Sequence, residues 1–206
     1  MRGKESRRES SMLDEILAQE YPKQETLKDG TKVTIRPLEA DDVEALYAFF
    51  QSIPRKDRIF LKDDIRDKNI IQGWCNNIDW DVVIPIVAIV DGDIVAEVSL
   101  HRERRGWKSH IGKLRLVVHP DFRRQGLAVD MINELIAVAL HTGSIEQLNA
   151  ECMVDVQRGA ILLLQLVGFV QRAILPGQVR DIEGTVHDLA LLSYTLRDQE
   201  DFPALD

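Results

Sequence analysis

The stretch KLRLVVHPDFRRQGLA, residues 113–128, decides the fold of this chain. It opens with an apolar strand pattern, which Pro120 ends because proline has no N–H to donate to a strand ladder. From Leu127 onward, apolar residues recur at helical spacing. Gly126, between the two, lets the backbone turn or come close to a large group where a side chain would clash. The stretch therefore predicts a strand, a tight turn and a helix.

The same turn predicts an anion-binding site. The N–H groups in the first turn of a helix have no partner within the helix, and they point outward at the positive end of its dipole. Arg123 and Arg124 add two cationic side chains there, which favours a diphosphate over a carboxylate. The chain has no G-x-x-x-x-G-K-[ST], and no G-x-G-x-x-G follows a strand. A kinase or a nicotinamide-dependent enzyme is therefore disfavoured.

The rest of the chain predicts a mixed α/β architecture. Alternating and continuous apolar runs mark seven strands, and Asp91-Gly92 joins two of them as a hairpin turn. Four helical patterns separate them, so the sheet is expected to carry helices on both faces. The helix 158–167 is apolar nearly all round, which predicts burial on most of its faces. The strands are expected at 31–37, 82–90, 94–100, 111–118, 147–154, 169–174 and 188–196, and the helices from about 41, 55, 127 and 158.

Length and composition set the broad class. A chain of 206 residues with 45% apolar residues can bury the core of one ordinary domain. Its net charge of −8 would repel a phosphate backbone, so nucleic-acid binding is not expected. Two cysteines form neither a disulfide framework nor a metal cluster, and we expect no metal site. Residues 1–11 lack the apolar core of a signal peptide, and no apolar run could span a membrane, so a cytoplasmic protein is expected.

The chain is expected to divide at about residue 30. Residues 1–29 are polar, with one short amphipathic helical pattern over 12–18. They predict an amino-terminal arm, partly helical, that packs on the domain or on a partner. Residues 30–206 form the domain itself.

Two motifs resemble the GCN5-related N-acetyltransferase (GNAT) family. The run Arg123–Ala128, after Val118-His119-Pro120, matches the family signature [RQ]-x-x-G-x-[GA] in full. The run 151–169, ECMVDVQRGAILLLQLVGF, resembles the family's strand, loop and helix ending in Gly-Phe at the expected distance. The resemblance covers about residues 30–197. It implies the GNAT fold, a mostly antiparallel central sheet of about six or seven strands flanked by helices on both faces.

The resemblance also implies a binding site for acetyl-CoA. In the family, the backbone amides of the turn hold the pyrophosphate, and the pantetheine arm pairs with the end of the preceding strand. An Asn often begins the buried helix and touches the cofactor; Gln157 stands at that position. Carried over, the cofactor-binding residues are Leu116, Val117, Val118, Arg123, Arg124, Gln125, Gly126, Leu127, Ala128 and Gln157.

The chain departs from the family at its catalytic positions. Where many members carry a glutamate base on the strand before the turn, this chain has Lys113 and Arg115. The usual tyrosine acid is replaced by Leu164. Acyl transfer to an amine still needs a group that takes the proton. The substitute candidates are Glu97, His110 and Glu151.

These observations lead to two functional hypotheses. The first is an N-acetyltransferase that moves an acetyl or other acyl group from acyl-CoA to a primary amine by direct attack on the thioester. The acceptor, a small molecule or a protein lysine, stays open, as does assembly into a homodimer. The second is a catalytically silent acyl-CoA-binding sensor or regulatory module, which the two departures motivate.

Overall fold

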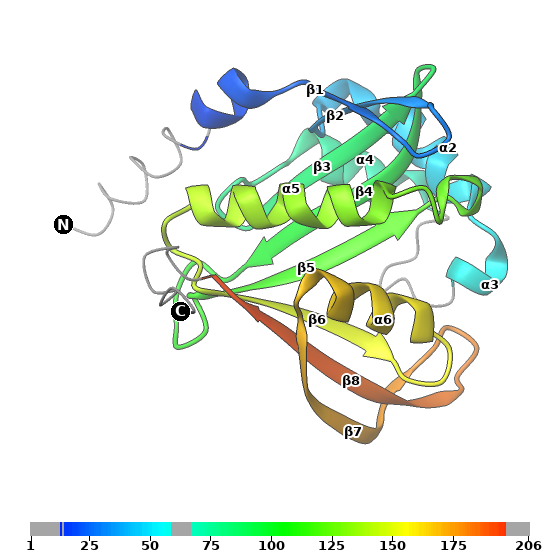
Figure 1. The fold of residues 1–206 in the computed structure, drawn as a ribbon, viewed down its shortest axis with the longest axis vertical. Helices are drawn as coiled ribbons and strands as arrows, with labels where there is room; N and C mark the ends of the chain where they lie inside the picture. The colour runs from blue at the N-terminus through cyan, green and yellow to red at the C-terminus, as the bar shows by residue number, and fades with distance from the viewer. Residues whose placement is uncertain (1–12, 14, 59–66, 197–206) are drawn as a thin grey trace, which may run out of the picture.

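The computed structural model describes residues 13, 15–58 and 67–196, which form one eight-stranded sheet with helices on both faces (Figure 1). The strand order is β1-β2-β3-β4-β5-β6-β8-β7. The strands are β1 (Lys23–Thr26), β2 (Lys32–Pro37), β3 (Val83–Val90), β4 (Asp93–Arg102), β5 (Ile111–Val118), β6 (Gln147–Met153), β7 (Val170–Arg180) and β8 (Val186–Thr195). The helices are α2 (Val43–Ser52), α3 (Arg55–Arg58), α4 (Lys68–Asn76), α5 (Leu127–His141) and α6 (Arg158–Val167).

Two apolar cores lie on opposite faces of the sheet. α5 supplies the centre of the larger one, with Leu127, Met131, Ile132 and Leu135 all 0% exposed. Leu127, Met131 and Leu135 lie four residues apart and Ile132 follows Met131, so they form one stripe along the helix. α2 and α4 build the smaller core on the other face, against β3 and β4. The helices on both faces confirm the mixed α/β class.

Local sequence explains the turns that connect these elements. Asp91 and Gly92 adopt φ values of 51° and 93°, the left-handed conformation that a two-residue hairpin turn requires. Gly143 and Gly168, with φ of 64° and 110°, follow the ends of α5 and α6 in the same conformation, which stops a helix without steric cost. The predicted hairpin and the predicted ends of both helices are therefore confirmed.

Among the described strands, β5 and β6 form the one parallel pair, and they separate soon after it begins. Their register covers three pairs, from Ile111↔Gln147 to Lys113↔Asn149. Beyond Lys113, the two strands diverge (Figure 1). All other neighbours in the sheet are antiparallel. The sheet is thus split along one side of β5.

The described part of the amino-terminal arm packs on the domain. Residues 15–20 are helical, and β1 adds an eighth strand to the sheet by pairing with β2. The Tyr21 hydroxyl donates to Glu134 Oε2 on α5 at 2.7 Å, and Lys23 Nζ lies 2.8 Å from the same oxygen. The arm is therefore fixed along α5.

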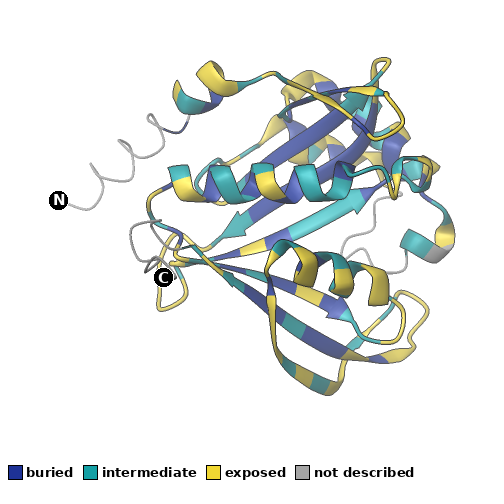
Figure 2. Cartoon of the chain, viewed as in Figure 1, coloured by how far each residue is buried: buried dark blue, intermediate teal, exposed yellow. Residues whose placement is uncertain are grey.

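The prediction that α6 is buried on most faces is wrong. Leu164 is buried at 4% exposure, whereas Leu162 and Leu166 are 66% and 79% exposed. α6 packs against β6, β8 and α5 near one edge of the sheet, and its outer side is exposed (Figure 2). None of the helices in the described ranges is long and apolar enough to cross a membrane.

The two kinds of α6 leucine give a stability prediction. Leu164→Ala should lower the free energy of unfolding by about 2–4 kcal/mol, because it leaves a cavity in the core. Leu166→Ala is the matched control and should change that energy by about 0.5 kcal/mol or less. Denaturant unfolding measures both, and equal losses would contradict this account of α6.

Candidate functional site

The turn between β5 and α5 has a backbone conformation that holds it open. Gly126 is the N-cap of α5 with φ 101°, and Arg124 has φ 63°. Both lie in the left-handed region, which costs little at glycine and more at arginine. A short 3₁₀ turn, Pro120–Phe122, precedes them. The chain thus leaves β5 and enters α5 with its backbone turned toward solvent.

Five consecutive backbone N–H groups in this turn lack a partner among the described residues. Arg123 N donates to Pro120 O at 3.2 Å, and Val129 N donates to Gly126 O at 2.8 Å. The N–H groups of Arg124–Ala128, between these two bonds, donate to no described group. Amides that converge at the positive end of a helix form a binding site for an anion.

The two arginines of the turn lie in different surroundings. Arg123 donates from Nε to Val118 O at 3.2 Å, and its Nη2 lies 3.1 Å from Asp57 Oδ2 on α3. Both arginines are exposed, and the Arg123 guanidinium braces the turn against β5 and α3. Gln125, the third side chain of the turn, donates from Nε2 to Asp121 O at 3.2 Å.

The edge of β5 that faces the split is open for hydrogen bonding. His119 N donates to Val95 O at 2.9 Å, which sets the alternation of the antiparallel ladder between β4 and β5. Leu116 and Val118 therefore direct their backbone groups away from β4, toward the split. Val117 directs its groups toward β4. The open edge leads directly into the anion turn (residues 123–128), so one extended ligand could occupy both.

Gln157 closes the other side of the split. It is the N-cap of α6, and its Oε1 accepts a hydrogen bond from Met153 N at 2.7 Å. The side chain thus joins the end of β6 to the start of α6. Leu164, which is buried in the same helix, has no ionisable proton to donate.

Glu97 is a buried acid beside the open edge. It pairs with Val117 on β5 and with Val87 on β3, on the face that α2 and α4 cover. Glu97 is 9% exposed, and burial raises the pKa of its carboxyl to about 7, against the opposing effects of the Ser99 hydroxyl and Arg115. A carboxyl with such a pKa can take up and release a proton near neutral pH.

Two polar side chains continue from Glu97 along the same face of β4. The Ser99 hydroxyl favours the ionised form of the Glu97 carboxyl and so opposes the rise in its pKa, and its Oγ lies 3.1 Å from His101 Nε2. The three residues alternate along the strand, so their side chains share one face. The spacing E-x-S-x-H in the sequence carried this signal, but Ser99 and His101 were not among the predicted residues.

The other two candidate bases lie elsewhere. His110 precedes β5, eight residues from Val118, or about 26 Å along an extended strand. Its carbonyl oxygen accepts from Glu146 N at 2.9 Å. Glu151 is exposed on β6, beyond the last residue of that strand that pairs with β5. The structure thus places Glu97 next to the open edge, Glu151 across the split and His110 at its closed end.

A buried histidine holds the loops on the far side of the split together. His187 Nδ1 lies 2.8 Å from Asp155 Oδ2, after β6, and Nε2 lies 3.1 Å from Asp181 Oδ2, between β7 and β8. The two carboxylates raise the pKa of His187 above its ordinary value. Among the described residues, no group of three or more His, Cys, Asp or Glu side chains is arranged to hold a metal ion.

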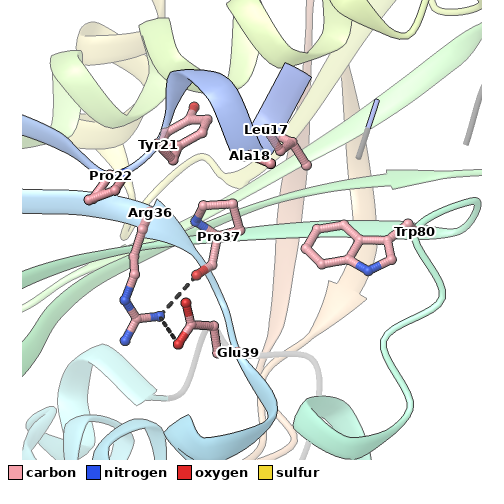
Figure 3. Close-up of a pocket in the computed structure, with 8 residues that line it drawn as sticks. All are labelled: Leu17, Ala18, Tyr21, Pro22, Arg36, Pro37, Glu39 and Trp80. Atoms are coloured by element: carbon pink, nitrogen blue, oxygen red, sulfur yellow. Dashed lines mark hydrogen bonds and ion pairs between the residues drawn. The ribbon is translucent and has the colours of Figure 1, made fainter. Parts of the chain in front are cut away.

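A separate pocket of about 260 Å³ lies between the arm and the end of β2 (Figure 3). The Trp80 carbonyl at its wall accepts from Arg102 at 2.9 Å, at the end of β4. The anion turn lies beside Val95, at the opposite end of that strand. Arg36, which lines the pocket, forms a bidentate ion pair with Asp42 at 2.6 and 2.7 Å. This pocket is therefore no part of the site.

Comparisons with known proteins bear on the family and the fold. The sequence model of the acetyltransferase (GNAT) family matches residues 43–169, more than half of the chain. No curated protein matches the chain in sequence.

Solved structures share the fold at low sequence identity. The GNAT domain of S. lividans PAT is 18% identical with a TM-score of 0.70, over 84% of this chain and 96% of that one. Ribosomal-protein-S5-alanine acetyltransferase from Vibrio fischeri is 13% identical with a TM-score of 0.72, over 82% and 95%. yncA from Salmonella typhimurium, solved with its cofactor acetyl-CoA, is 18% identical with a TM-score of 0.67, over 84% and 99%.

The geometry of the turn predicts that a large side chain at Gly126 prevents the binding of acetyl-CoA. Gly126→Trp should abolish the stabilisation by acetyl-CoA, because the side chain would stand where the anion binds. Gly143→Trp, at the other end of α5, is the control, since its φ is also positive and open space surrounds it. Both variants should lose about 1–3 kcal/mol of stability to backbone strain. Calorimetric titration with acetyl-CoA should separate them, and unchanged affinity in Gly126→Trp would contradict the site.

The His187 contacts predict a pH dependence. Its folded pKa lies above its unfolded pKa, so its stabilising effect is complete below about pH 6.5 and disappears as pH rises through the folded value. Hydrogen exchange in the β7–β8 turn should therefore accelerate with pH beyond the intrinsic rate, and His187→Asn should remove this excess. An NMR titration that gives His187 a pKa below 6.5 would contradict the contacts.

Proposed function

The chain belongs to the acetyltransferase (GNAT) family, and on that premise we propose that it transfers the acetyl group of acetyl-CoA to a primary amine. Acetyl-CoA is the co-substrate. The observation that carries the proposal is the row of unpartnered N–H groups at Arg124–Ala128, continuous with the open edge of β5. Such a row suits a linear ligand with a diphosphate at one end and amide groups behind it.

The co-substrate would be held almost entirely by backbone groups. The amides of Arg124–Ala128 bind the diphosphate at the start of α5. The amide groups of pantetheine pair with the N–H and C=O groups of Leu116 and with the N–H of Val118, as an added strand would, since Val118 O already accepts from Arg123 Nε. This arrangement brings the thioester into the split, next to the strand that pairs with Glu97.

The reaction needs one bond formed and one broken. The neutral amine nitrogen attacks the thioester carbonyl carbon, and the carbon–sulfur bond breaks as the amide forms. The nitrogen loses its proton to the enzyme, and the sulfur leaves as the CoA thiolate. Holding the amine and the thioester side by side supplies much of the acceleration.

Glu97 would accept the proton, directly or through one water. Its Cα lies about 5.5 Å from that of Val117, the usual separation of a hydrogen-bonded antiparallel pair. From Glu97, the proton can pass through the Ser99 hydroxyl to His101 Nε2. This path replaces the base that Lys113 and Arg115 do not provide.

The departing sulfur has less need of a donor. A thiolate is a weaker base than an alkoxide or an amide ion, so it is a tolerable leaving group near neutral pH without a proton donor. This property is consistent with Leu164, buried at 4% exposure, at the position of the usual acid.

The direct test of the function is turnover. Purified protein should be stabilised by acetyl-CoA and should release CoA thiol with at least one member of a panel of polyamines, amino acids and lysine peptides. Mass spectrometry should find the acetylated amine. Stabilisation without release across the whole panel would contradict an enzyme and support a silent acyl-CoA-binding module.

Glu97 gives a sharper prediction about catalysis. Glu97→Gln should lower kcat by roughly 10²–10⁴-fold and leave the affinity for acetyl-CoA unchanged, since the amide cannot accept the proton. Glu151→Gln is the matched control on β6 and should keep kcat within a few-fold of the wild-type value. In the wild type, kcat/KM should rise through a pKa of about 7, because only the carboxylate form accepts a proton.

The thermal stability of Glu97→Gln distinguishes a loss of catalysis from a loss of folding. Because the folded pKa of Glu97 lies above its unfolded value, ionisation destabilises the fold as pH rises from about 4.5 to about 7. Glu97→Gln should therefore unfold at a higher temperature than the wild type at pH 8. Full activity in this variant would contradict the role of Glu97.

A further inference from the structure

The turn between β1 and β2 lies directly on the anion turn, although the two are far apart in the sequence. Lys28 N donates to Gln125 O at 3.1 Å. This bond fixes residues 27–31 beside the backbone that leads into α5. The matched family region begins at residue 43, so this contact comes from outside it.

The β1–β2 turn is held rigidly enough to present a side chain. Leu27, 3% exposed, anchors it in the larger core. Leu27 N donates to Thr31 O, and Gly30 N donates to Leu27 O, both at 2.9 Å. Asp29 Oδ1 accepts from Thr31 N at 3.0 Å. Lys28 is exposed at the tip of this closed loop.

The side chain of Lys28 runs past Gly126. A methyl group added at Gly126 would lie 4.0 Å from Lys28 Cε and 3.7 Å from Asp130 Oδ2. The ammonium group therefore stands within reach of whatever binds the amides at Gly126. Asp130, in the first turn of α5, would repel a diphosphate, and Lys28 is the cation that offsets it.

We propose that Lys28 is a phosphate ligand of acetyl-CoA, contributed to the site by the amino-terminal β1–β2 turn. The inference rests on the proposed function, because it takes the diphosphate to bind at Arg124–Ala128. Lys28 supplies the mobile positive charge that Arg123 does not, since Arg123 is held by Val118 O and Asp57. A flexible ammonium suits a phosphate oxygen as a point charge. The phosphate is either the diphosphate or the 3′-phosphate of CoA.

The test compares Lys28→Gln with Lys32→Gln, an exposed lysine of the same hairpin. Calorimetry measures the affinity of each for acetyl-CoA, 3′-dephospho-acetyl-CoA and S-acetylpantetheine, which lacks the diphosphate. Lys28→Gln should bind acetyl-CoA roughly tenfold more weakly, the usual effect of a lost charge-assisted hydrogen bond. Lys32→Gln should bind like the wild type, and S-acetylpantetheine should not distinguish the three proteins. A loss that persists with the dephospho compound assigns the contact to the diphosphate, and a loss that vanishes assigns it to the 3′-phosphate.

Other outcomes overturn the inference. If Lys28→Gln binds acetyl-CoA as tightly as the wild type, the role of Lys28 is contradicted and the proposed function is unaffected. If the wild type does not bind acetyl-CoA, both the role of Lys28 and the proposed function are contradicted. An equal loss with S-acetylpantetheine would show that Lys28 acts through the shape of the turn. If Lys28 only neutralises Asp130, the double variant Lys28→Gln/Asp130→Asn should match Asp130→Asn alone. A direct contact predicts that the double variant binds more weakly than Asp130→Asn.

Discussion

A backbone N–H group without an acceptor in the protein must be satisfied by solvent or by a ligand, and five such groups at Arg124–Ala128 have no acceptor within residues 13, 15–58 and 67–196. The left-handed conformations of Arg124 and Gly126 make this possible, because they turn the chain without closing its amides onto itself. The rest of the site is arranged around this row. β5 leads a ligand into it, the β1–β2 turn flanks it, and Arg123 braces it against α3 through Asp57.

The split between β5 and β6 places the two parts of the proposed chemistry on opposite sides of β5. On one side of β5, open backbone groups suit the arm of the co-substrate. Across β5, Glu97 lies in the neighbouring strand, buried enough to raise its pKa to about 7. An acid on β4 rather than on β5 would place the proton acceptor one strand away from the proposed thioester position, while Lys113 and Arg115 occupy β5. Lys113, Arg115 and Leu164, at the positions of the family's usual base and acid, are therefore compatible with acyl transfer beside β5.

The sequence predicted the elements that depend on local chemistry. Pro120 and Gly126 predicted the turn, the spacing of apolar residues predicted α5, and Asp91-Gly92 predicted the hairpin. Each of these signals determines the structure of residues close to it in the sequence. The burial of α6 was mispredicted, because an apolar helix at the margin of a sheet can leave leucines exposed. The role proposed for Lys28 depends on a contact between segments distant in the sequence, which the sequence pattern does not encode. The spacing of Glu97, Ser99 and His101 is visible in the sequence, but the burial that raises the pKa of Glu97 depends on how distant elements pack. The assignments of Arg123 and Gln157 to cofactor binding stay predictions, and the structure gives both side chains internal partners.

The central claim is that the amides of Arg124–Ala128 grip the diphosphate of acetyl-CoA, and a crystal structure with that compound bound tests it most directly. The account predicts phosphate oxygens about 2.7–3.2 Å from several of these nitrogens, with pantetheine beside Leu116 and Val118. A diphosphate bound elsewhere on the chain, with these five amides bonded to groups of the protein, would contradict it.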